Sequence, residues 1–244
     1  MAFVTVLRDQ DTLATAAAER VTALAVAAIA ERQRASLCLS GGRTPGRLYE
    51  LLADPSRPWR ATVDWARVHV LWGDERPVPP DHPESNFGMA RRALLAHVPI
   101  PANQVHRMRG ELPDVADAAR EYDATVRAYE PFDVLLLGLG EDGHIASVFP
   151  GSPLLSHDLI NPVAAVRVEH LHAWRITLTP PALLGARAIL VLVSGAEKAA
   201  AVRAALEGPE EVSRRPAQLL RAAGTRVEWL IDSAAAQRLG APPA

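Results

Sequence analysis

Hydrophobic positions along the chain gather in six short segments that are rich in β-branched residues and leucine. Each segment is six to eight residues long, which is a typical strand length. The predicted strands are residues 3–8, 35–40, 67–72, 132–139, 187–194 and 226–231. Three of these segments, ASLCLS, FDVLLLGL and RAILVLVS, are almost continuously apolar, as expected of strands covered on both faces.

Segments with a helical spacing of apolar residues lie between the strands and are rich in Ala, Leu, Arg and Glu. The predicted helices are residues 11–34, 44–53, 85–98, 114–129, 197–207 and 214–223. Strands that alternate with helices favour an α/β fold with a mostly parallel, doubly wound sheet and helices on both faces. No repeat or change of composition marks a linker, so we expect residues 1–244 to form a single domain.

Turn residues mark the ends of several elements. Thr44 is expected to cap a helix with Pro45 at its first position, and Ser85 to cap the helix that follows it. Gly208-Pro209 should end the helix that begins near residue 197. Residues 141–161 contain two glycines and two prolines with little periodicity, which predicts a long loop after the 132–139 strand.

Composition and charge narrow the class of protein. Hydrophobic residues make up 49% of the chain and charged residues 22%, as in globular proteins. The net charge of −2, with both signs interspersed, does not support a nucleic-acid or anionic-membrane surface. The apolar stretch at residues 21–30 is too short to span a bilayer, and the N-terminus lacks a secretory pattern. A single cysteine, Cys38, excludes an intrachain disulfide, so we expect a cytoplasmic protein.

Glycines follow four of the predicted strands, together with charged or hydroxyl residues. The segments are SGGRTP after residue 39, GDER after residue 72, GLGEDGH after residue 137 and SGAEK after residue 193. In open parallel sheets, ligands bind outside the carboxyl ends of the strands. One such segment would form a turn, whereas four of them indicate a ligand site.

The segment SGGRTP is suited to bind an anion. Its glycines permit close approach of the backbone, and the following helix presents free N–H groups and the positive end of its dipole. The residues concerned are Ser40, Gly41, Gly42, Arg43 and Thr44. No Gly-Lys-Ser/Thr follows, which excludes a Walker A loop. The alternative is a tight strand-to-helix turn with a capping threonine.

Three cations lie beside or near strand ends: Arg76, Arg175 and Lys198. Each alone is typical of a solvated surface. Together with the glycine turn, they indicate a pocket for a phosphate dianion.

The run from Gly138 to Gly143 also matches the dinucleotide-binding pattern G-x-G-x-x-G, and Glu169 ends the next β-like run. That fingerprint needs a full helix after its third glycine. The residues 150–153, PGSP, leave room for barely two turns, so the dinucleotide hypothesis is disfavoured.

His144 is placed to act as a general base, because it lies near Asp142 on a glycine-rich loop at a strand's carboxyl end. The alternative is a histidine that only closes a loop hydrogen bond. A metal at His170 and His172 with Glu169 lacks a further ligand nearby. No nucleophile elbow exists, and Cys38 lies inside a strand as an inert thiol. We therefore expect activated water, with no metal, no cofactor and no covalent intermediate.

Five motifs resemble the 6-phosphogluconolactonase family, which is grouped with the glucosamine-6-phosphate deaminases. They are, in chain order, SGGRTP, WGDERPVPPDHPESNFGMA, LLGLGEDGHIASVFPG, RITLT and SGAEKA. They run from residue 40 to 199, about two thirds of the chain, and the W-x-D-E-R and D-G-H-x-A-S-x-F-P blocks are specific together. The resemblance implies a modified Rossmann-like fold without a nucleotide. It also implies hydrolysis of 6-phospho-D-glucono-1,5-lactone in the oxidative branch of the pentose phosphate pathway.

The resemblance implies roles for individual residues. His144 would activate water, and Asp142 and Asp74 would lie near the histidine and the sugar, with either able to orient the imidazole. The phosphate ligands implied are the SGG turn, Arg76, Arg175 and Lys198.

Two alternatives within this resemblance remain. The deaminases carry a glutamate five residues after the histidine, where this chain has Phe149. A non-catalytic sugar-phosphate-binding protein would have no need of His144. The expected partner is a small sugar phosphate, with no nucleic acid or membrane, and we expect a monomer rather than an obligate oligomer.

Overall fold

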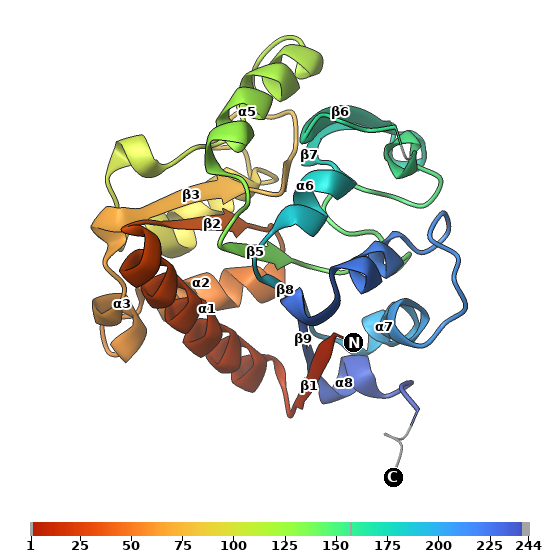
Figure 1. Cartoon of the computed structure of the whole chain (residues 1–244), viewed down its shortest axis with the longest axis horizontal. Helices are drawn as coiled ribbons and strands as arrows, with labels where there is room; N and C mark the ends of the chain where they lie inside the picture. The colour runs from red at the N-terminus through yellow and green to blue at the C-terminus, as the bar shows by residue number, and fades with distance from the viewer. Residues whose placement is uncertain (1, 157, 241–244) are drawn as a thin grey trace.

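The computed structural model describes residues 2–156 and 158–240. A six-stranded sheet with parallel neighbours runs through its centre in the order β1-β9-β8-β5-β2-β3 (Figure 1). Its strands are β1 (Phe3–Leu7), β2 (Ala35–Leu39), β3 (Val68–Trp72), β5 (Val134–Leu137), β8 (Ile189–Val193) and β9 (Val227–Asp232). All six correspond to strands predicted from the hydrophobic pattern, and the doubly wound α/β fold is confirmed.

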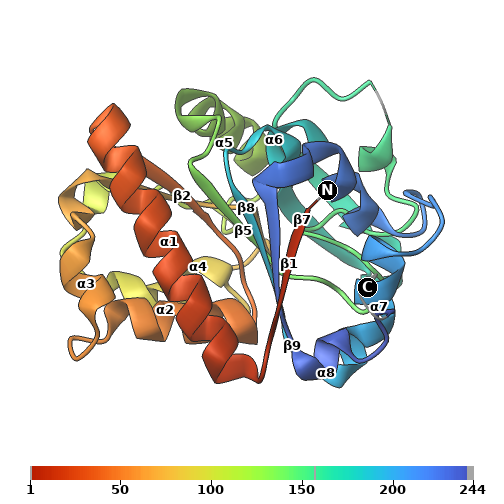
Figure 2. The same ribbon diagram turned by 60° about the horizontal axis from the view of Figure 1, so that its bottom comes forward.

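Helices cover both faces of this sheet, as Figure 2 shows. One face carries α1 (Gln10–Arg32), α2 (Arg43–Ala53) and α3 (Pro58–Thr62). The other carries α5 (Val115–Tyr129), α6 (Pro180–Gly185) and the 3₁₀ helix η7 (Pro216–Arg226). Every residue of β2, β5 and β8 is buried between these layers, which explains their continuous apolar runs.

Helix α1 is long and apolar enough, by length and composition, to cross a bilayer. In the fold, however, it packs against α2 and along β2, β5, β8 and β9. It buries small and medium side chains on that side, namely Leu13, Ala14, Ala17, Ala18, Val21, Thr22, Ala25 and Ala28. The structure therefore accounts for its apolar character as part of the core.

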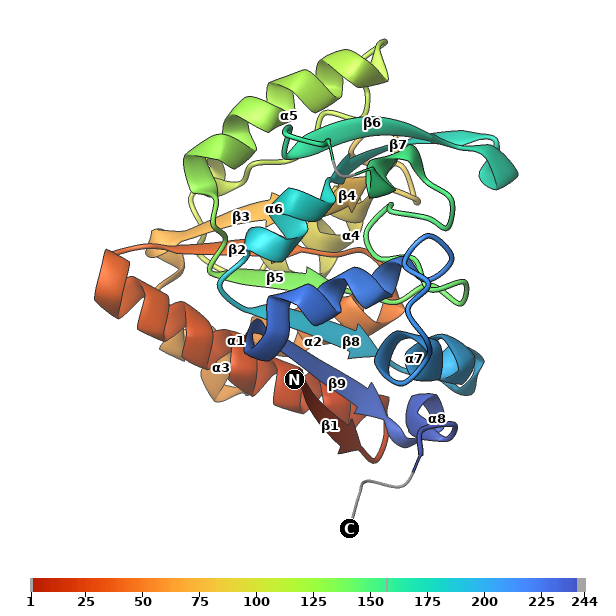
Figure 3. The same cartoon turned by 45° about the vertical axis from the view of Figure 1, so that its right-hand side comes forward.

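A second, three-stranded antiparallel sheet was not among the six predicted strands. Its order is β4-β7-β6, with β4 (Asp74–Glu75), β7 (Ala173–Leu178) and β6 (Val163–Val168). Figure 3 shows it beside α5, which packs against β6 and β7. Because β4 has two residues and β6 and β7 are partly exposed, their hydrophobic pattern is weak.

The start of α2 differs from the prediction. Gly42 occupies the N-cap position and the helix begins at Arg43, so Thr44 is not the capping residue and Pro45 is not the first helical residue. Ser85 does cap α4 (Asn86–Ala90), since its hydroxyl accepts a bond of 2.9 Å from the amide of Gly88.

The other predicted helices are present with altered ends. The 85–98 segment is α4 followed by a π-helical turn, η2 (Arg91–Leu95), and the 197–207 segment is η6 (Ala196–Lys198) followed by α7 (Ala199–Leu206). Gly208 follows the end of α7, as predicted. The remaining elements are η1 (Trp65–Arg67), η3 (Ala102–Gln104), η4 (Pro153–Leu155), η5 (Glu169–Leu171) and α8 (Ser233–Ala236). The described part of 141–161 is the predicted loop, with η4 as its one helical turn.

Candidate active site

The four glycine-containing strand ends lie together at one edge of the main sheet. They enclose a cavity of about 280 Å³ at the carboxyl ends of β2, β5 and β8 and beside β4. Nine predicted site residues line it: Ser40, Gly41, Gly42, Arg43, Thr44, Asp74, Arg76, His144 and Lys198. The other two, Asp142 and Arg175, lie outside the lining, and each is close to a residue that belongs to it.

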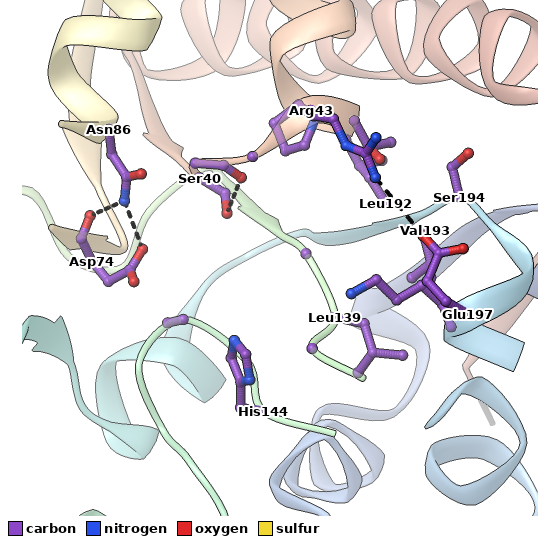
Figure 4. Close-up of a pocket in the computed structure, with 18 of the residues that line it drawn as sticks. Ser40, Arg43, Asp74, Asn86, Leu139, His144, Leu192, Val193, Ser194 and Glu197 are labelled. Atoms are coloured by element: carbon purple, nitrogen blue, oxygen red, sulfur yellow. Dashed lines mark hydrogen bonds and ion pairs between the residues drawn. The ribbon is translucent and has the colours of Figure 1, made fainter. Parts of the chain in front are cut away.

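Figure 4 shows how the labelled residues face one another across this cavity. The ring of His144 projects from the loop after β5. Asp74 and Asn86 lie together on one side, and Arg43 lies next to Glu197 on another. The cavity therefore brings together an imidazole, carboxylates and cationic groups from different loops.

The two glycines of the turn after β2 are required for different reasons. A Cβ at Gly41 would overlap the side-chain amide of Asn86. Gly42 has a φ of 102°, a conformation that L side chains rarely adopt. Ser40 is held by Tyr49, whose hydroxyl accepts from the Ser40 amide at 3.0 Å and donates to its carbonyl at 2.8 Å. The turn is therefore rigid, and it places the N-terminus of α2 at the cavity.

Three cationic side chains line the cavity. Arg43 is almost fully exposed, with its guanidinium 3.9 Å from Glu197, and Lys198 Nζ is 3.9 Å from the carboxylate of Glu141. Arg76 donates to the carbonyl of Glu84, while its Nε has no hydrogen-bond partner among the described residues. These loose or incomplete pairings leave donor capacity for an anionic ligand.

Arg175 lies on β7, outside the cavity lining. Burial lowers the pKa of its guanidinium, and the neighbouring charge of Arg76 lowers that pKa further. Neighbouring guanidinium groups repel each other unless an anion compensates them. The structure thus places Arg175 as a neighbour of the lining cation Arg76, and not in the lining itself.

His144 is oriented by Asp142. Its Nδ1 lies 2.6 Å from Asp142 Oδ1, which also accepts from the His144 amide at 3.1 Å. Burial opposes ionisation of Asp142, but the bonds from His144 outweigh it and lower the pKa of this carboxyl below its usual value. A Cβ at Gly140 would overlap both groups. The carboxylate thus fixes the tautomer that leaves Nε2 available as a base.

Phe149 packs against the other side of this imidazole. The two ring centroids are 4.1 Å apart and the planes are inclined by 31°, while Phe149 also contacts His170 edge to face. Phe149 is buried, so an apolar ring occupies the position where the deaminases carry a glutamate. The histidine has a single carboxylate partner among the described residues.

Asp74 is held away from His144 by other partners. Its Oδ2 accepts from Ser147 Oγ at 2.6 Å, and its Oδ1 accepts from Asn86 Nδ2 at 3.1 Å. Of the two aspartates that could have oriented the imidazole, the one in contact is Asp142. Asn86 and Ser147 were not predicted as site residues, although both lie inside the motifs ESNFGMA and HIASVF.

Other candidate chemistry is not supported by the described part of the chain. No group of three or more His, Cys, Asp or Glu side chains suited to a metal occurs in it, so Glu169, His170 and His172 do not form such a cluster. Burial raises the pKa of the Cys38 thiol well above its usual value, as expected for an inert core residue. Residues 141–152 contain no helix that could present its N-terminus to a dinucleotide.

Known proteins with similar sequences support the family resemblance. The 6-phosphogluconolactonase of Mycobacterium tuberculosis is 39% identical over 245 residues, which cover 95% of this chain and 96% of that protein. The 6-phosphogluconolactonase of Synechocystis is 37% identical over 228 residues, 90% of each chain.

Solved structures agree with the sequence relatives. The 6-phosphogluconolactonase of Trypanosoma brucei matches with a TM-score of 0.85 at 30% identity, over 98% of this chain and 99% of that one. A monomeric glucosamine-6-phosphate deaminase, 24% identical, shares the fold with a TM-score of 0.84 over 96% of this chain and 99% of that one. The family model for glucosamine-6-phosphate isomerases/6-phosphogluconolactonase matches residues 8–229. The chain therefore belongs to the glucosamine-6-phosphate isomerase/6-phosphogluconolactonase family.

Proposed function

We propose that this protein hydrolyses 6-phospho-D-glucono-1,5-lactone to 6-phospho-D-gluconate, in the oxidative branch of the pentose phosphate pathway. The observation that carries the proposal is the His144–Asp142 pair, with a separation of 2.6 Å, on the wall of a cavity lined by three cationic side chains. The related proteins that bear the name 6-phosphogluconolactonase support the same activity.

The substrate phosphate is proposed to bind at the start of α2. The backbone of the Ser40–Thr44 turn meets the cavity there, with Arg43 beside it and Lys198 at the end of the neighbouring SGAEK segment. Amide groups and a helix dipole favour an anion, and the cations add charge-assisted hydrogen bonds. Arg76 lies on the β4 side, and Arg175, outside the lining, is a neighbouring positive charge.

The proposed chemistry uses His144 as a general base. Water attacks C1 of the lactone while His144 Nε2 takes the proton, and the carbonyl oxygen becomes an oxyanion. Collapse of this intermediate breaks the bond between C1 and the ring oxygen, and the imidazolium returns its proton to that oxygen. Asp142 stabilises the imidazolium, and a positioned base of this kind contributes on the order of 10²–10⁴-fold. Backbone N–H groups or Arg76 are the candidates to bind the oxyanion.

Asp74 is proposed to bind the sugar rather than to assist the base. Its carboxylate is held by Ser147 and Asn86, and it faces the cavity on the side opposite Glu197. A fixed carboxylate is a good acceptor for sugar hydroxyl groups. Asp74 would therefore orient C1 toward His144.

The reaction needs few components. A δ-lactone carbonyl is already activated, so one water and one base suffice, and the proposal includes no metal and no cofactor. We propose that residues 1–244 act as a single domain, as a cytoplasmic monomer, on a small sugar phosphate. Deamination of glucosamine 6-phosphate requires several proton transfers and more than one acid or base. Phe149, packed on His144, does not supply the second group.

The test is turnover of freshly generated 6-phosphogluconolactone, with spontaneous hydrolysis subtracted. His144→Ala should lower kcat at least about 100-fold with an unchanged circular dichroism spectrum. His97→Ala removes a histidine that lies outside the cavity lining, so it serves as the matched control and should leave kcat unchanged.

Glucosamine 6-phosphate offered at the same concentration distinguishes the sister activity. We expect no release of ammonia. Release of ammonia without turnover of the lactone would contradict the proposal, and so would a His144→Ala variant that keeps the kcat of the parent.

A further inference from the structure

One buried acidic side chain next to the cavity has no role in the chemistry described above. Glu75 lies between Asp74 and Arg76, both of which line the cavity, but its own side chain faces the interior and is 2% exposed. Burying a carboxylate is costly unless hydrogen bonds satisfy it. The partners of Glu75 therefore indicate what the group does.

The carboxylate of Glu75 accepts four hydrogen bonds. Oε1 accepts from the backbone amides of Arg76 and Asn86, each at 2.8 Å. Oε2 accepts from the amide of Phe87 at 2.8 Å and from the hydroxyl of Ser85 at 3.1 Å. All four partners are donors, and three of them belong to the first residues of α4 or to its cap. Glu75 thereby joins the two ends of the loop of residues 76–87, because Arg76 and residues 85–87 bond to the same carboxylate.

Two residues held in this way line the cavity. Asn86 directs its side-chain amide to Asp74, with Nδ2 at 2.8 Å from the Asp74 carbonyl and 3.1 Å from its carboxylate. The same amide fills the space beside Gly41. Arg76 begins the loop at its other end. A shift of the loop would therefore move a cation, a sugar-binding carboxylate and one side of the glycine turn together.

We propose that Glu75 is a positioning residue for substrate binding, which acts through Arg76 and Asn86 and does not touch the substrate. This inference rests on the proposed function of the cavity. The role requires a group with acceptors only. Glutamine has the same shape, but its NH₂ would face N–H or O–H donors at one end of the side chain.

Burial raises the pKa of the Glu75 carboxyl, and the amides of Phe87, Asn86 and Arg76 oppose that shift. These amides stabilise the ionised form on which the loop depends. The bonds that order the cavity wall thus offset part of the cost of burying the charge.

The experiment compares Glu75→Gln with a matched control, Asp133→Asn. Asp133 is also a buried carboxylate, accepts from the Ser36 amide at 2.8 Å and pairs with Arg32 at 2.7 Å. It precedes β5, at the end of the sheet opposite to the cavity. Both variants should lower Tm, because each puts an NH₂ where donors need an acceptor.

The two variants should differ in binding. Titration calorimetry with 6-phosphogluconate, well below Tm, should show Kd raised about 10-fold in Glu75→Gln and changed less than about twofold in Asp133→Asn. Ser85→Ala removes one of the four donors, together with the cap bond to Gly88, and keeps the carboxylate and its three amide donors. It should therefore give a smaller rise in Kd, and it provides a second variant if Glu75→Gln does not fold. An unchanged Kd in both Glu75→Gln and Ser85→Ala would overturn the proposal.

Hydrogen exchange provides a readout that does not depend on the substrate. Amides of residues 76–88 should exchange faster in Glu75→Gln than in the parent. In Asp133→Asn, the same amides should exchange at the rate of the parent. If the parent neither binds 6-phosphogluconate nor turns over the lactone, the proposed function is wrong. Hydrogen exchange then tests independently whether Glu75 orders the loop of residues 76–87. Unchanged exchange across 76–88 in Glu75→Gln would contradict the role.

Discussion

At the scale of single residues, the imidazole of His144 is constrained on two sides. Asp142 bonds to Nδ1, and the ring of Phe149 packs against the imidazole at 4.1 Å between centroids. Gly140 leaves the space in which the histidine and aspartate meet. Such constraints hold a base in one tautomer and one orientation, which lowers the entropy cost of reaching the transition state.

The lining cations allow a prediction at the same scale. Lys198→Ala should raise the Kd for 6-phosphogluconate about 10- to 100-fold, because it removes a charge-assisted contact worth about 1.5–3 kcal/mol. Arg175→Ala should raise it less, since Arg175 is a charge neighbour of Arg76 but does not line the cavity. Titration calorimetry of both variants measures the difference.

Arg203→Ala is the matched control, because Arg203 lies on α7 near Lys198 but is 63% exposed and pairs with Glu207. It should bind as the parent does. A Lys198→Ala variant with unchanged affinity would show that the phosphate binds elsewhere. A larger loss of affinity in Arg175→Ala than in Lys198→Ala would show that Arg175 is the main phosphate ligand of the two.

At the scale of elements, the turn from β2 to α2 both lines the cavity and contacts α4. Gly42 is the N-cap of α2 and has a positive φ. Gly41, which lacks a Cβ, leaves space for the side chain of Asn86 from α4. Two loops that are 45 residues apart in the chain thus share one wall of the cavity. The turn and the 76–87 loop must therefore keep their positions together.

Gly41→Ala tests this coupling. The added methyl group would overlap the Asn86 amide and displace it from Asp74, so KM for the lactone should rise about 10-fold or more. Gly185→Ala, at a helical glycine with open space around it, should leave KM unchanged. An unchanged KM in Gly41→Ala would mean that the Asn86 amide can move without any effect on substrate binding.

At the scale of the whole molecule, a parallel sheet places every strand's carboxyl end at the same edge. The cavity lies at that edge, while Cys38 lies inside β2 and is fully buried. Because burial also raises its pKa, the thiolate that reacts with thiol reagents is scarce as well as inaccessible.

Modification of Cys38 should therefore report unfolding. We expect a disulfide reagent to react on the order of 10³-fold more slowly in native buffer than in denaturant, since a stable core opens rarely. The variant Cys38→Ala/Ala61→Cys, with its thiol on the exposed residue 61, should react quickly in both. Rapid reaction of the native parent would show that the centre of the sheet opens locally.

The hydrophobic pattern alone determined the main sheet and most helices, because strands buried on both faces and amphipathic helices carry strong, local signals. It also located the four glycine-containing strand ends, and with them nine of the residues that line the cavity. Residue types in a short segment were enough to predict His144 as the base and to limit its carboxylate partner to Asp142 or Asp74.

Only the tertiary structure decided which groups meet across the sheet. It showed that Asp142, and not Asp74, bonds to His144, and that Arg175 lies outside the cavity lining. It also showed the small sheet, the contact of Gly41 with Asn86 and the four bonds that bury Glu75. These contacts join residues that are distant in the chain or depend on the exact path of a loop, and neither is encoded in local periodicity or spacing.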